Sequence, residues 1–236
     1  MRLDKFLCDN NIGTRSQVKE YIKKGQVTVN GQTAKKPETK VDEANDTVIF
    51  QGRKVHYQKY AYYMLNKPEG VVSATNDNTA PTVVSLLTVP EQKNLFPVGR
   101  LDKDTTGLLL LTNDGALAHN LLSPKKHVDK TYLVKPEKPL SPEDIHRLEE
   151  GLDIGDDKPT APAKAELVKN GSLLLTIHEG RFHQVKRMLQ AIDNQVLTLE
   201  RVRFGPLSLD PALQRGEYRA LTEEEIDVLS GSGRNS

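Results

Sequence analysis

The hydrophobic pattern of the first sixty residues predicts two short helices followed by a small sheet. Thr14 and Gln17 form a capping-box pattern at the start of the second helix, and Gly25 predicts its end. Apolar residues on one side of this helix recur every three or four positions. The residues on another side are basic and recur every four positions: Arg15, Lys19 and Lys23. Alternating valines then lead into Asn30-Gly31, which favours a type I′ hairpin turn, so a small sheet follows.

From Tyr60 onward the chain has longer apolar runs separated by turns. The segment YAYYMLNKPEGVVSAT predicts a strand, a turn at residues 67–70 and a second strand. Residues 96–101 and 108–112 have strand character around a loop at 102–107, and GSLLLTIHEG reads as a buried strand. Helices are predicted at ALAHNLL, SPEDIHRLEEG, RFHQVKRMLQAI and LTEEEIDVL. Because strands and helices mix without a regular β-α-β alternation, we expect an α+β fold with a mixed, largely antiparallel sheet.

These patterns divide the 236 residues into three parts. Residues 1–58 form a small N-terminal domain, and RKVHYQKY is a polar connector out of it. Residues 59–230 form the larger α+β domain. Residues 231–236, within the sequence SGSGRNS, are expected to be a disordered tail.

Charge is distributed unevenly although the whole chain is nearly balanced. The chain has 33 Lys and Arg against 32 Asp and Glu, a net charge of +1. Residues 1–58 hold 11 basic and 7 acidic residues, a net charge of +4, which leaves 22 and 25 for the remainder, a net charge of −3. A basic N-terminal module favours a polyanionic partner, while an ordinary solvated surface is the alternative interpretation.

Composition argues against several classes of protein. Cys8 stands alone, so the sequence has no disulfide framework or cysteine-rich metal site. His178 and His183 are the only close pair of histidines and have no third ligand nearby in sequence, so we expect no metal. The N-terminal segment lacks the apolar core of a signal peptide, and no apolar run approaches membrane-spanning length. We therefore expect a cytoplasmic protein that does not bind a membrane.

The segment GRLDKDTTGLLLLTNDG, residues 99–115, places charged residues directly before four leucines. Asp102 follows an apolar residue, and we expect it at a strand end from which its side chain reaches a cleft. Asp104 precedes two threonines and fits the common role of a loop aspartate that bonds its own amides. Residues 108–111 are expected in the core.

Two further segments carry candidate chemistry. In DKTYLV, Tyr132 opens a strand directly behind a threonine and a lysine. In EGRFHQVKRM and the residues after it, the predicted apolar helix face comprises Phe182, Val185, Met188, Leu189 and Ile192. The other faces carry Arg181, His183, Lys186, Arg187 and Gln190. Each segment taken alone also fits ordinary packing or a solvated helix surface.

The N-terminal unit resembles the S4 RNA-binding domain through RLDKFL, TRSQVKEYIKKGQVTVNG and the later predicted strand DTVIFQG. This resemblance implies that the second helix and the turn after it face RNA. It makes the following residues candidate RNA contacts: Arg15, Ser16, Lys19 and Lys23. Clustered cations of this kind neutralise phosphates.

Behind this unit, the three segments occur in the order found in the pseudouridine synthases of the RsuA branch, which the chain resembles over nearly its whole length. YYMLNKPEGVVSAT and RGEYRALTEEEI also match that branch. The resemblance implies that Asp102 is the nucleophile, Tyr132 an active-site tyrosine and Lys186 the basic partner of the aspartate. The following residues become candidate contacts to RNA phosphates or to other active-site groups: Arg100, Arg181 and Arg187.

Pseudouridine formation detaches uracil from its ribose and rejoins it through carbon. The reaction is redox-neutral, so the lack of a dinucleotide or phosphate-loop fingerprint in the sequence agrees with it, and we expect no cofactor. It needs an ionised carboxylate in a dry site, which a nearby ammonium such as that of Lys186 supports. The target base must leave its stack to reach Asp102.

The resemblance implies ribosomal RNA as the partner of a monomeric enzyme. The segments DKDTTGL and KTYLV match the small-subunit enzymes better than the large-subunit ones, which implies uridine 516 of 16S rRNA, on free RNA or in an assembling small subunit. A 23S rRNA synthase of the same family and a catalytically silent S4-type assembly factor are the alternatives. A two-carboxylate hydrolase built on Asp102 and Asp104 is less favoured. Residues two apart on a strand point the same way and crowd each other, whereas glycosidases hold their acids about 5–9 Å apart across a sugar.

Overall fold

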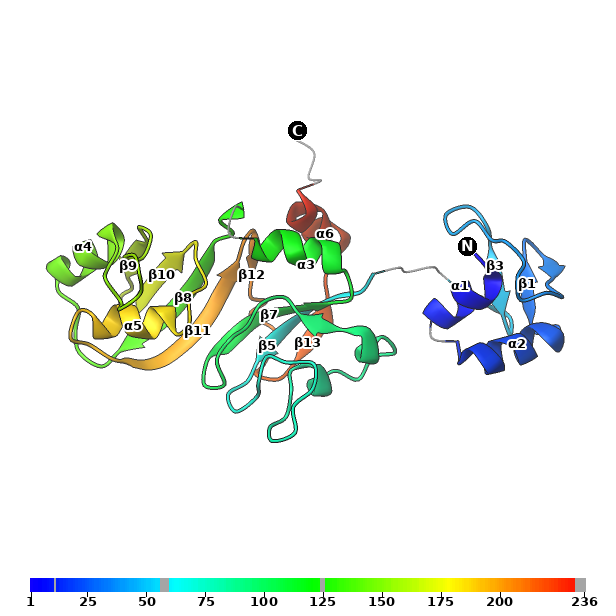
Figure 1. Ribbon diagram of the computed structural model, residues 1–236, viewed down its shortest axis with the longest axis horizontal. Helices are drawn as coiled ribbons and strands as arrows, with labels where there is room; N and C mark the ends of the chain where they lie inside the picture. The colour runs from blue at the N-terminus through cyan, green and yellow to red at the C-terminus, as the bar shows by residue number, and fades with distance from the viewer. Residues whose placement is uncertain (11, 56–59, 124–125, 232–236) are drawn as a thin grey trace. The chain divides into compact units, whose positions relative to one another are not determined.

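The computed structural model describes residues 1–10, 12–55, 60–123 and 126–231. The chain divides into two compact units, Met1–Tyr60 and Ala61–Ser236 (Figure 1). The expected domain boundary between residues 58 and 59 lies outside the described residues, as do residues 232–236 of the tail expected at 231–236. Within those ranges, no helix has the length and apolar character needed to cross a membrane.

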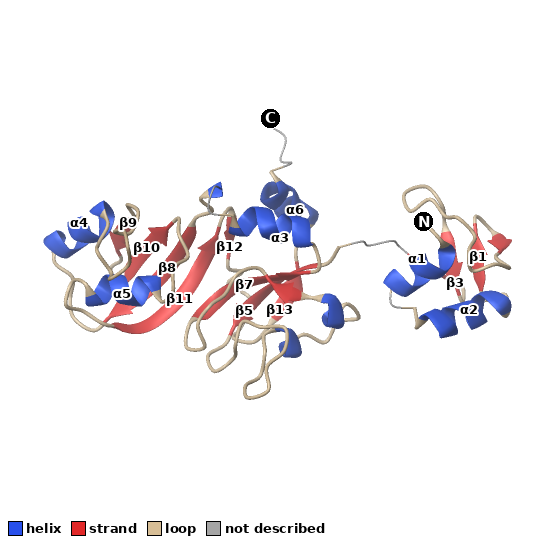
Figure 2. Ribbon diagram, in the orientation of Figure 1, coloured by secondary structure: helices blue, strands red, loops and turns tan. Residues whose placement is uncertain are grey.

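The smaller unit packs two helices on a four-stranded antiparallel sheet (Figure 2). Its elements are α1 (Leu3–Asp9), α2 (Arg15–Lys23), β1 (Val27–Val29), β2 (Gln32–Thr33), β3 (Val48–Phe50) and β4 (Arg53–Val55), with strand order β2-β1-β3-β4. The capping box of Thr14 and Gln17 is present, and Asn30 and Gly31 both have positive φ in the hairpin turn, as predicted.

The first residues of the predicted connector are instead part of this sheet. Residues 53–55 form β4 and pair with β3. Gln51 and Gly52 have φ of 48° and 79°, which makes a second tight hairpin turn of the same kind as Asn30-Gly31. The prediction of a polar connector from residue 53 was therefore wrong for its first three residues, and residues 56–59 lie outside the described residues.

The larger unit is built on a mixed sheet. Its strands are β5 (Tyr62–Lys67), β6 (Phe96–Pro97), β7 (Thr106–Thr112), β8 (Lys130–Pro136), β9 (Lys164–Leu167), β10 (Leu173–Ile177), β11 (Val196–Phe204), β12 (Leu207–Ser208) and β13 (Tyr218–Ala220). The main path runs β13-β5-β7-β11-β8-β10-β9, with β6 beside β7 and β12 beside β11. The pairing of β7 with β11 is parallel and the other pairings are antiparallel, which confirms the predicted α+β class.

Helices cover both faces of this sheet (Figures 1 and 2). They are α3 (Gly115–Leu122), α4 (Pro142–Glu150), α5 (Gln184–Gln190) and α6 (Glu223–Ser230), with single 3₁₀ turns at Val84–Leu86 and Gln92–Asn94. Successive side chains of a strand point to opposite faces. Leu108 and Leu110 thus join the core that includes α3 and α6, while Leu109 and Leu111 join the core that includes α4 and α5. The run of four leucines is buried, as predicted, because β7 has a core on each side.

Two strand predictions around the charged segment were wrong. Residues after the 67–70 turn do not form a strand, and Val72 makes only an isolated bridge to Thr82. The strand predicted at 96–101 ends at Pro97, so Asp102 lies in a loop rather than at a strand end. Gly99 has a φ of 80°, and the backbone N–H and C=O of Leu101 bond the Ser73 side chain instead of a neighbouring strand.

Candidate active site

The loop that carries Asp102 is fixed at both ends. Ser73 Oγ accepts from the Leu101 N–H at 3.0 Å and donates to the Leu101 C=O at 2.8 Å. The Thr105 N–H donates to the Asp102 C=O at 3.1 Å, which closes a tight turn over residues 102–105. Leu101 and Thr105 are buried on either side, so the side chain of Asp102 projects from an anchored backbone.

Beneath this loop lies a buried lysine, Lys67. Its ammonium donates to the backbone oxygens of Thr105 at 2.8 Å, Pro68 at 3.1 Å and Lys103 at 3.4 Å. Burial lowers the pKa of Lys67 to about 8, although Asp104 and Asp102 oppose that shift. The sequence predicts only a turn at KPEG. Nothing near Lys67 in the sequence indicates its buried position, because two of its three partners, the Lys103 and Thr105 carbonyls, lie more than thirty residues away along the chain.

Lys186, from α5, contacts the loop from the other side. Its Nζ lies 3.2 Å from Asp102 Oδ2 and 2.7 and 2.9 Å from the two carboxylate oxygens of Asp104. Burial would lower the pKa of Lys186, but hydrogen bonds to Asp104 and Asp102 raise it above its usual value. The ammonium therefore remains charged at neutral pH and bridges both carboxylates.

Asp104 has a larger part in this cluster than its loop position indicated. Burial tends to raise the pKa of Asp104, but the contact with Lys186 outweighs it and lowers that pKa. The side chain is 60% exposed, whereas that of Asp102 is 32% exposed. Asp104 thus holds Lys186 from the solvent side, and Asp102 lies nearer the pocket.

A pocket of about 600 Å³ opens beside the Asp102–Lys186 pair. Tyr132, on β8 and only 8% exposed, lines it together with both members of the pair. Much of the remaining wall is apolar: Leu101, Leu121, Ile177, Val185, Leu199 and Phe204. The three residues predicted to be catalytic, which are far apart in the sequence, thus line one pocket.

The segment before α5 differs from its prediction. The helix begins at Gln184, because His183 adopts a left-handed conformation with a φ of 46°. Phe182 therefore lies outside the helix and is 75% exposed, so its assignment to the apolar helix face was wrong. Its ring stacks on that of His183 at 3.8 Å between centroids, and His183 Nε2 lies 3.6 Å from Asp102 Oδ1.

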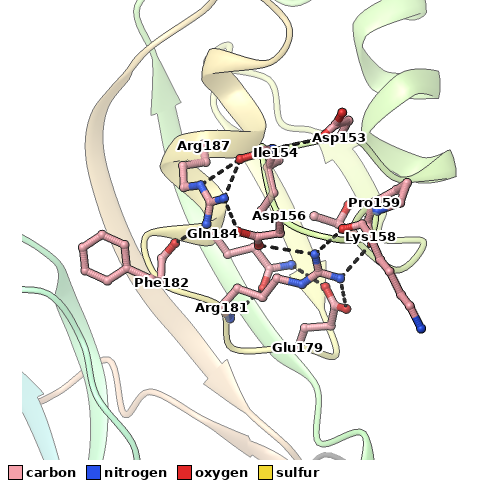
Figure 3. Close-up of polar contacts among 12 residues, drawn as sticks. Asp153, Ile154, Asp156, Lys158, Pro159, Glu179, Arg181, Phe182, Gln184 and Arg187 are labelled. Atoms are coloured by element: carbon pink, nitrogen blue, oxygen red, sulfur yellow. Dashed lines mark hydrogen bonds and ion pairs between the residues drawn. The ribbon is translucent and has the colours of Figure 1, made fainter.

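The two arginines of this segment are engaged within the protein (Figure 3). Arg181 pairs with Glu179 and donates to the Lys158 and Pro159 carbonyls. Arg187 donates to the Ile154 and Phe182 carbonyls and pairs with Asp156. Hydrogen bonds from Arg187 and then Arg181 hold the pKa of Asp156 below its usual value. The Arg181 and Arg187 guanidinium groups thus tie the start of α5 and the residues before it to residues 154–159, and the Phe182 ring points away from this network (Figure 3).

The other predicted RNA contacts are accessible. Arg100 is exposed and lines the mouth of the pocket. In the smaller unit, four predicted contacts lie exposed on α2: Arg15, Ser16, Lys19 and Lys23. Val18 and Ile22, on the opposite side of the same helix, are buried, as the periodicity predicts.

Chemically, the pocket combines a carboxylate, a cation that holds it and an aromatic hydroxyl in apolar surroundings. The Asp102 carboxylate and the Lys186 ammonium form an ion pair at 3.2 Å. A charged carboxylate in such a setting can act as a nucleophile or as a base. The flat ring of Tyr132 and the apolar walls suit a planar heterocycle rather than an extended polar chain.

Comparison with known families agrees with both units. The family model described as RNA pseudouridylate synthase matches residues 61–191, and the S4 domain model matches residues 1–48. A crystal structure described as a pseudouridylate synthase superimposes with a TM-score of 0.70 at 40% sequence identity, covering 97% of this chain and 99% of that one.

Full-length relatives carry related names. A relative from Bacillus subtilis described as the uncharacterized RNA pseudouridine synthase YtzG is 51% identical over 98% of both chains. The ribosomal small subunit pseudouridine synthase A of Vibrio vulnificus is 45% identical, covering 97% of this chain and 99% of the relative. The enzyme of the same name from Escherichia coli is 42% identical, covering 96% and 98%.

Proposed function

The chain belongs to the RNA pseudouridylate synthase family, in the branch with an N-terminal S4 domain, and on that premise we propose that it converts one uridine of 16S ribosomal RNA, uridine 516, to pseudouridine. Asp102 is the proposed nucleophile, Lys186 its charged partner and Tyr132 the aromatic group that faces the extruded base. With ribosomal RNA as the substrate, we expect the reaction to take place in the cytoplasm.

The observation that carries the proposed site is the contact between Asp102 and Lys186 at the edge of a largely apolar pocket. The ammonium lies 3.2 Å from Asp102 Oδ2, and Asp104 holds it on its other side. This contact fixes the position of the Asp102 carboxylate at the pocket wall and supports it as the group that meets the substrate.

The reaction can be written for these residues so that its atoms balance. The N1–C1′ bond of uridine breaks, the uracil turns, and a C5–C1′ bond forms. The hydrogen on C5 leaves as a proton, and N1 takes up a proton in its place. Asp102 supplies the nucleophile for this exchange through a covalent bond to the nucleotide, and that bond breaks again before the product leaves, which restores the carboxylate. The Tyr132 hydroxyl lies in the same pocket and is the proposed partner for the C5 proton.

The choice of 16S rRNA rests on the small-subunit enzymes of Vibrio and Escherichia, which this chain resembles over nearly its entire length. The exposed basic residues of α2 are the proposed docking surface, because a helix face of Arg15, Lys19 and Lys23 can neutralise RNA phosphates. Arg100, at the pocket mouth, is the proposed contact to the RNA near the target nucleotide. The internal bonds of Arg181 and Arg187 favour a positioning role for both.

The catalytic proposal is tested by replacing one carboxylate at a time. Asp102→Asn should abolish tritium release from RNA labelled at uracil C5 while RNA binding stays close to that of the wild type. Asp104→Asn is the matched variant, because it also contacts Lys186 but leaves Asp102 in place, and it should retain measurable release. Release by Asp102→Asn at the wild-type rate would remove this aspartate from the mechanism.

The target is tested separately. We expect one 16S position, uridine 516, to lack pseudouridine in cells without this protein and to regain it when the wild-type gene is restored but not the Asp102→Asn variant. Loss of a pseudouridine from 23S rRNA, with 16S rRNA unchanged, would show that the enzyme modifies large-subunit RNA instead. That outcome would leave the chemistry at Asp102 intact.

A further inference from the structure

Arg201 is a buried cation in the pocket with no role in the proposal above. It lies on β11, opposite Tyr132 on β8 and opposite Gly107 on β7. Its side chain is among the largest that are fully buried, with 2% of the residue exposed, and it lines the same pocket as Asp102. A Cβ on Gly107 would lie 2.3 Å from the Arg201 carbonyl oxygen, so the glycine lets β7 and β11 approach closely.

The hydrogen bonds of this guanidinium are incomplete. Nε donates to the Leu108 carbonyl at 2.8 Å, and the group lies 5.0 Å from the centre of the Phe204 ring. Nη2 is buried and has no hydrogen-bond partner among the described residues. A buried donor without a partner costs about 1–3 kcal/mol, and more on a charged group.

The charge of Arg201 also lacks a counter-ion. No carboxylate in the described part of the chain forms an ion pair with it, and its neighbour Lys130 is another cation, whose pKa burial and then Arg201 lower. Burial lowers the pKa of Arg201 itself, and the electrostatic interaction and side-chain hydrogen bond with Tyr132 oppose that shift. A buried ion normally requires a partner of opposite charge or full hydrogen bonding, so an acceptor that enters the pocket would complete this site.

We propose that Arg201 binds a carbonyl oxygen of the extruded uracil through Nη2 and stabilises the negative charge on the base as it separates from the ribose. When the N1–C1′ bond breaks, its electron pair leaves with N1 and spreads over the uracil carbonyl oxygens. A fixed cation beside one of these oxygens favours that state over the neutral nucleotide. The negative charge on the base disappears when its electron pair forms the C5–C1′ bond, and the later loss of the C5 proton is balanced by a proton that N1 takes up. The inference rests on pseudouridine formation in this pocket and is independent of the 16S target.

Single-turnover tritium release from C5-labelled RNA tests this role. Arg201→Met keeps the length of the side chain but removes the donors and the charge, and the rate should fall by about 100-fold, the effect of removing one donor to a developing anion in other enzymes. RNA affinity, measured by filter binding, should change little. Arg203→Met is the matched control, because Arg203 is exposed on the same strand, and its rate should match that of the wild type.

A second measurement separates chemistry from folding. Millimolar guanidinium chloride should restore part of the rate of Arg201→Ala in a saturable way, while equal concentrations of sodium chloride should not. In addition, RNA with 2-thiouridine or 4-thiouridine at the target should react more slowly with the wild-type enzyme at one of the two positions, because sulfur is a weaker acceptor than oxygen. This substrate change needs no variant to fold.

The outcomes are distinct. A wild-type rate for Arg201→Met, or a wild-type enzyme indifferent to both sulfur substitutions, would overturn the inference. A loss of rate that follows a lowered melting temperature, with no guanidinium rescue, would also overturn it and make Arg201 a structural residue. A wild-type enzyme that releases no tritium from any ribosomal RNA would instead reject the proposed function.

Discussion

Replacement of Gly107 by alanine tests the close approach of β7 and β11. The new Cβ would lie 2.3 Å from the Arg201 carbonyl oxygen, 2.8 Å from the Arg201 nitrogen and 2.9 Å from Glu200 Cγ. Two of these atoms belong to the backbone of the neighbouring strand, so relief requires the parallel pair to separate. Gly107 also has a φ of 98°, which an alanine adopts only with strain.

The two costs can be worked separately. Strain at positive φ contributes about 1–2 kcal/mol, and overpacking in a core contributes about 1–3 kcal/mol. Gly107→Ala should therefore lower the free energy of unfolding by about 2–5 kcal/mol when these contributions add. Gly70→Ala is the matched control, because Gly70 has a φ of 84° and an added Cβ there meets nothing within 4 Å, so it carries the first cost alone.

Urea unfolding followed by circular dichroism measures both variants. We expect Gly107→Ala to be less stable than Gly70→Ala by the overlap cost, with a similar dependence on urea concentration. Tritium release by folded Gly107→Ala should also fall, because separation of the strands moves Arg201 in the pocket wall. Equal stabilities of the two variants would show that β7 and β11 do not approach as closely as the distances at Gly107 require.

Three further predictions concern lysines. The pKa of Lys67 is about 8 in the folded protein, against an ordinary value of 10.5. Between pH 8 and 10.5 the folded state therefore binds fewer protons than the unfolded state, so the free energy of unfolding rises with pH in that range. The stability of wild type relative to Lys67→Met, from urea unfolding, should thus rise by about 2 kcal/mol between pH 7.5 and 9.5; a constant difference would refute the lowered pKa. Lys186→Met should reduce tritium release far more than Lys186→Arg, because only the latter keeps a charge beside Asp102 and Asp104; equal reductions would show that charge is not what matters there. Lys19→Ala and Lys23→Ala should each reduce the slope of log affinity for RNA against log salt concentration by about 0.9 for every phosphate that is no longer neutralised, taking the value for duplex DNA. An unchanged slope would show that these lysines of α2 do not contact RNA phosphates.

Local features of the structure were predictable from the sequence. Thr14 caps its helix as the capping-box pattern predicts, and the helices predicted at SPEDIHRLEEG and LTEEEIDVL are present, capped by Ser141 and Thr222. Asn30-Gly31 forms the expected turn, and the four leucines of β7 are buried. Each of these depends on bonds or periodicities that span a few residues, which a sequence displays directly.

Features that depend on tertiary contacts were not predictable in this way. The strand predicted at DTVIFQG includes Gln51 and Gly52, but these two residues form a turn that adds β4 to the sheet. Phe182 follows helical spacing but is exposed, because His183 interrupts the helix with a positive φ. Lys67 and Arg201 were overlooked because their partners, the Thr105 and Leu108 carbonyls, lie far away in the chain.

The strand order explains why these distant residues meet. Asp102 precedes β7 by a short loop, Tyr132 lies on β8, Arg201 lies on β11, and Lys186 belongs to the helix that follows β10. In the sheet these strands are consecutive, in the order β7-β11-β8-β10, although β11 is the last of them in the chain. Insertion of β11 between β7 and β8 creates the parallel pair at Gly107 and brings the guanidinium between the aspartate loop and the tyrosine strand. The pocket is therefore complete only when β11 has paired, and a substitution that weakens its parallel contact should impair catalysis before it unfolds the domain.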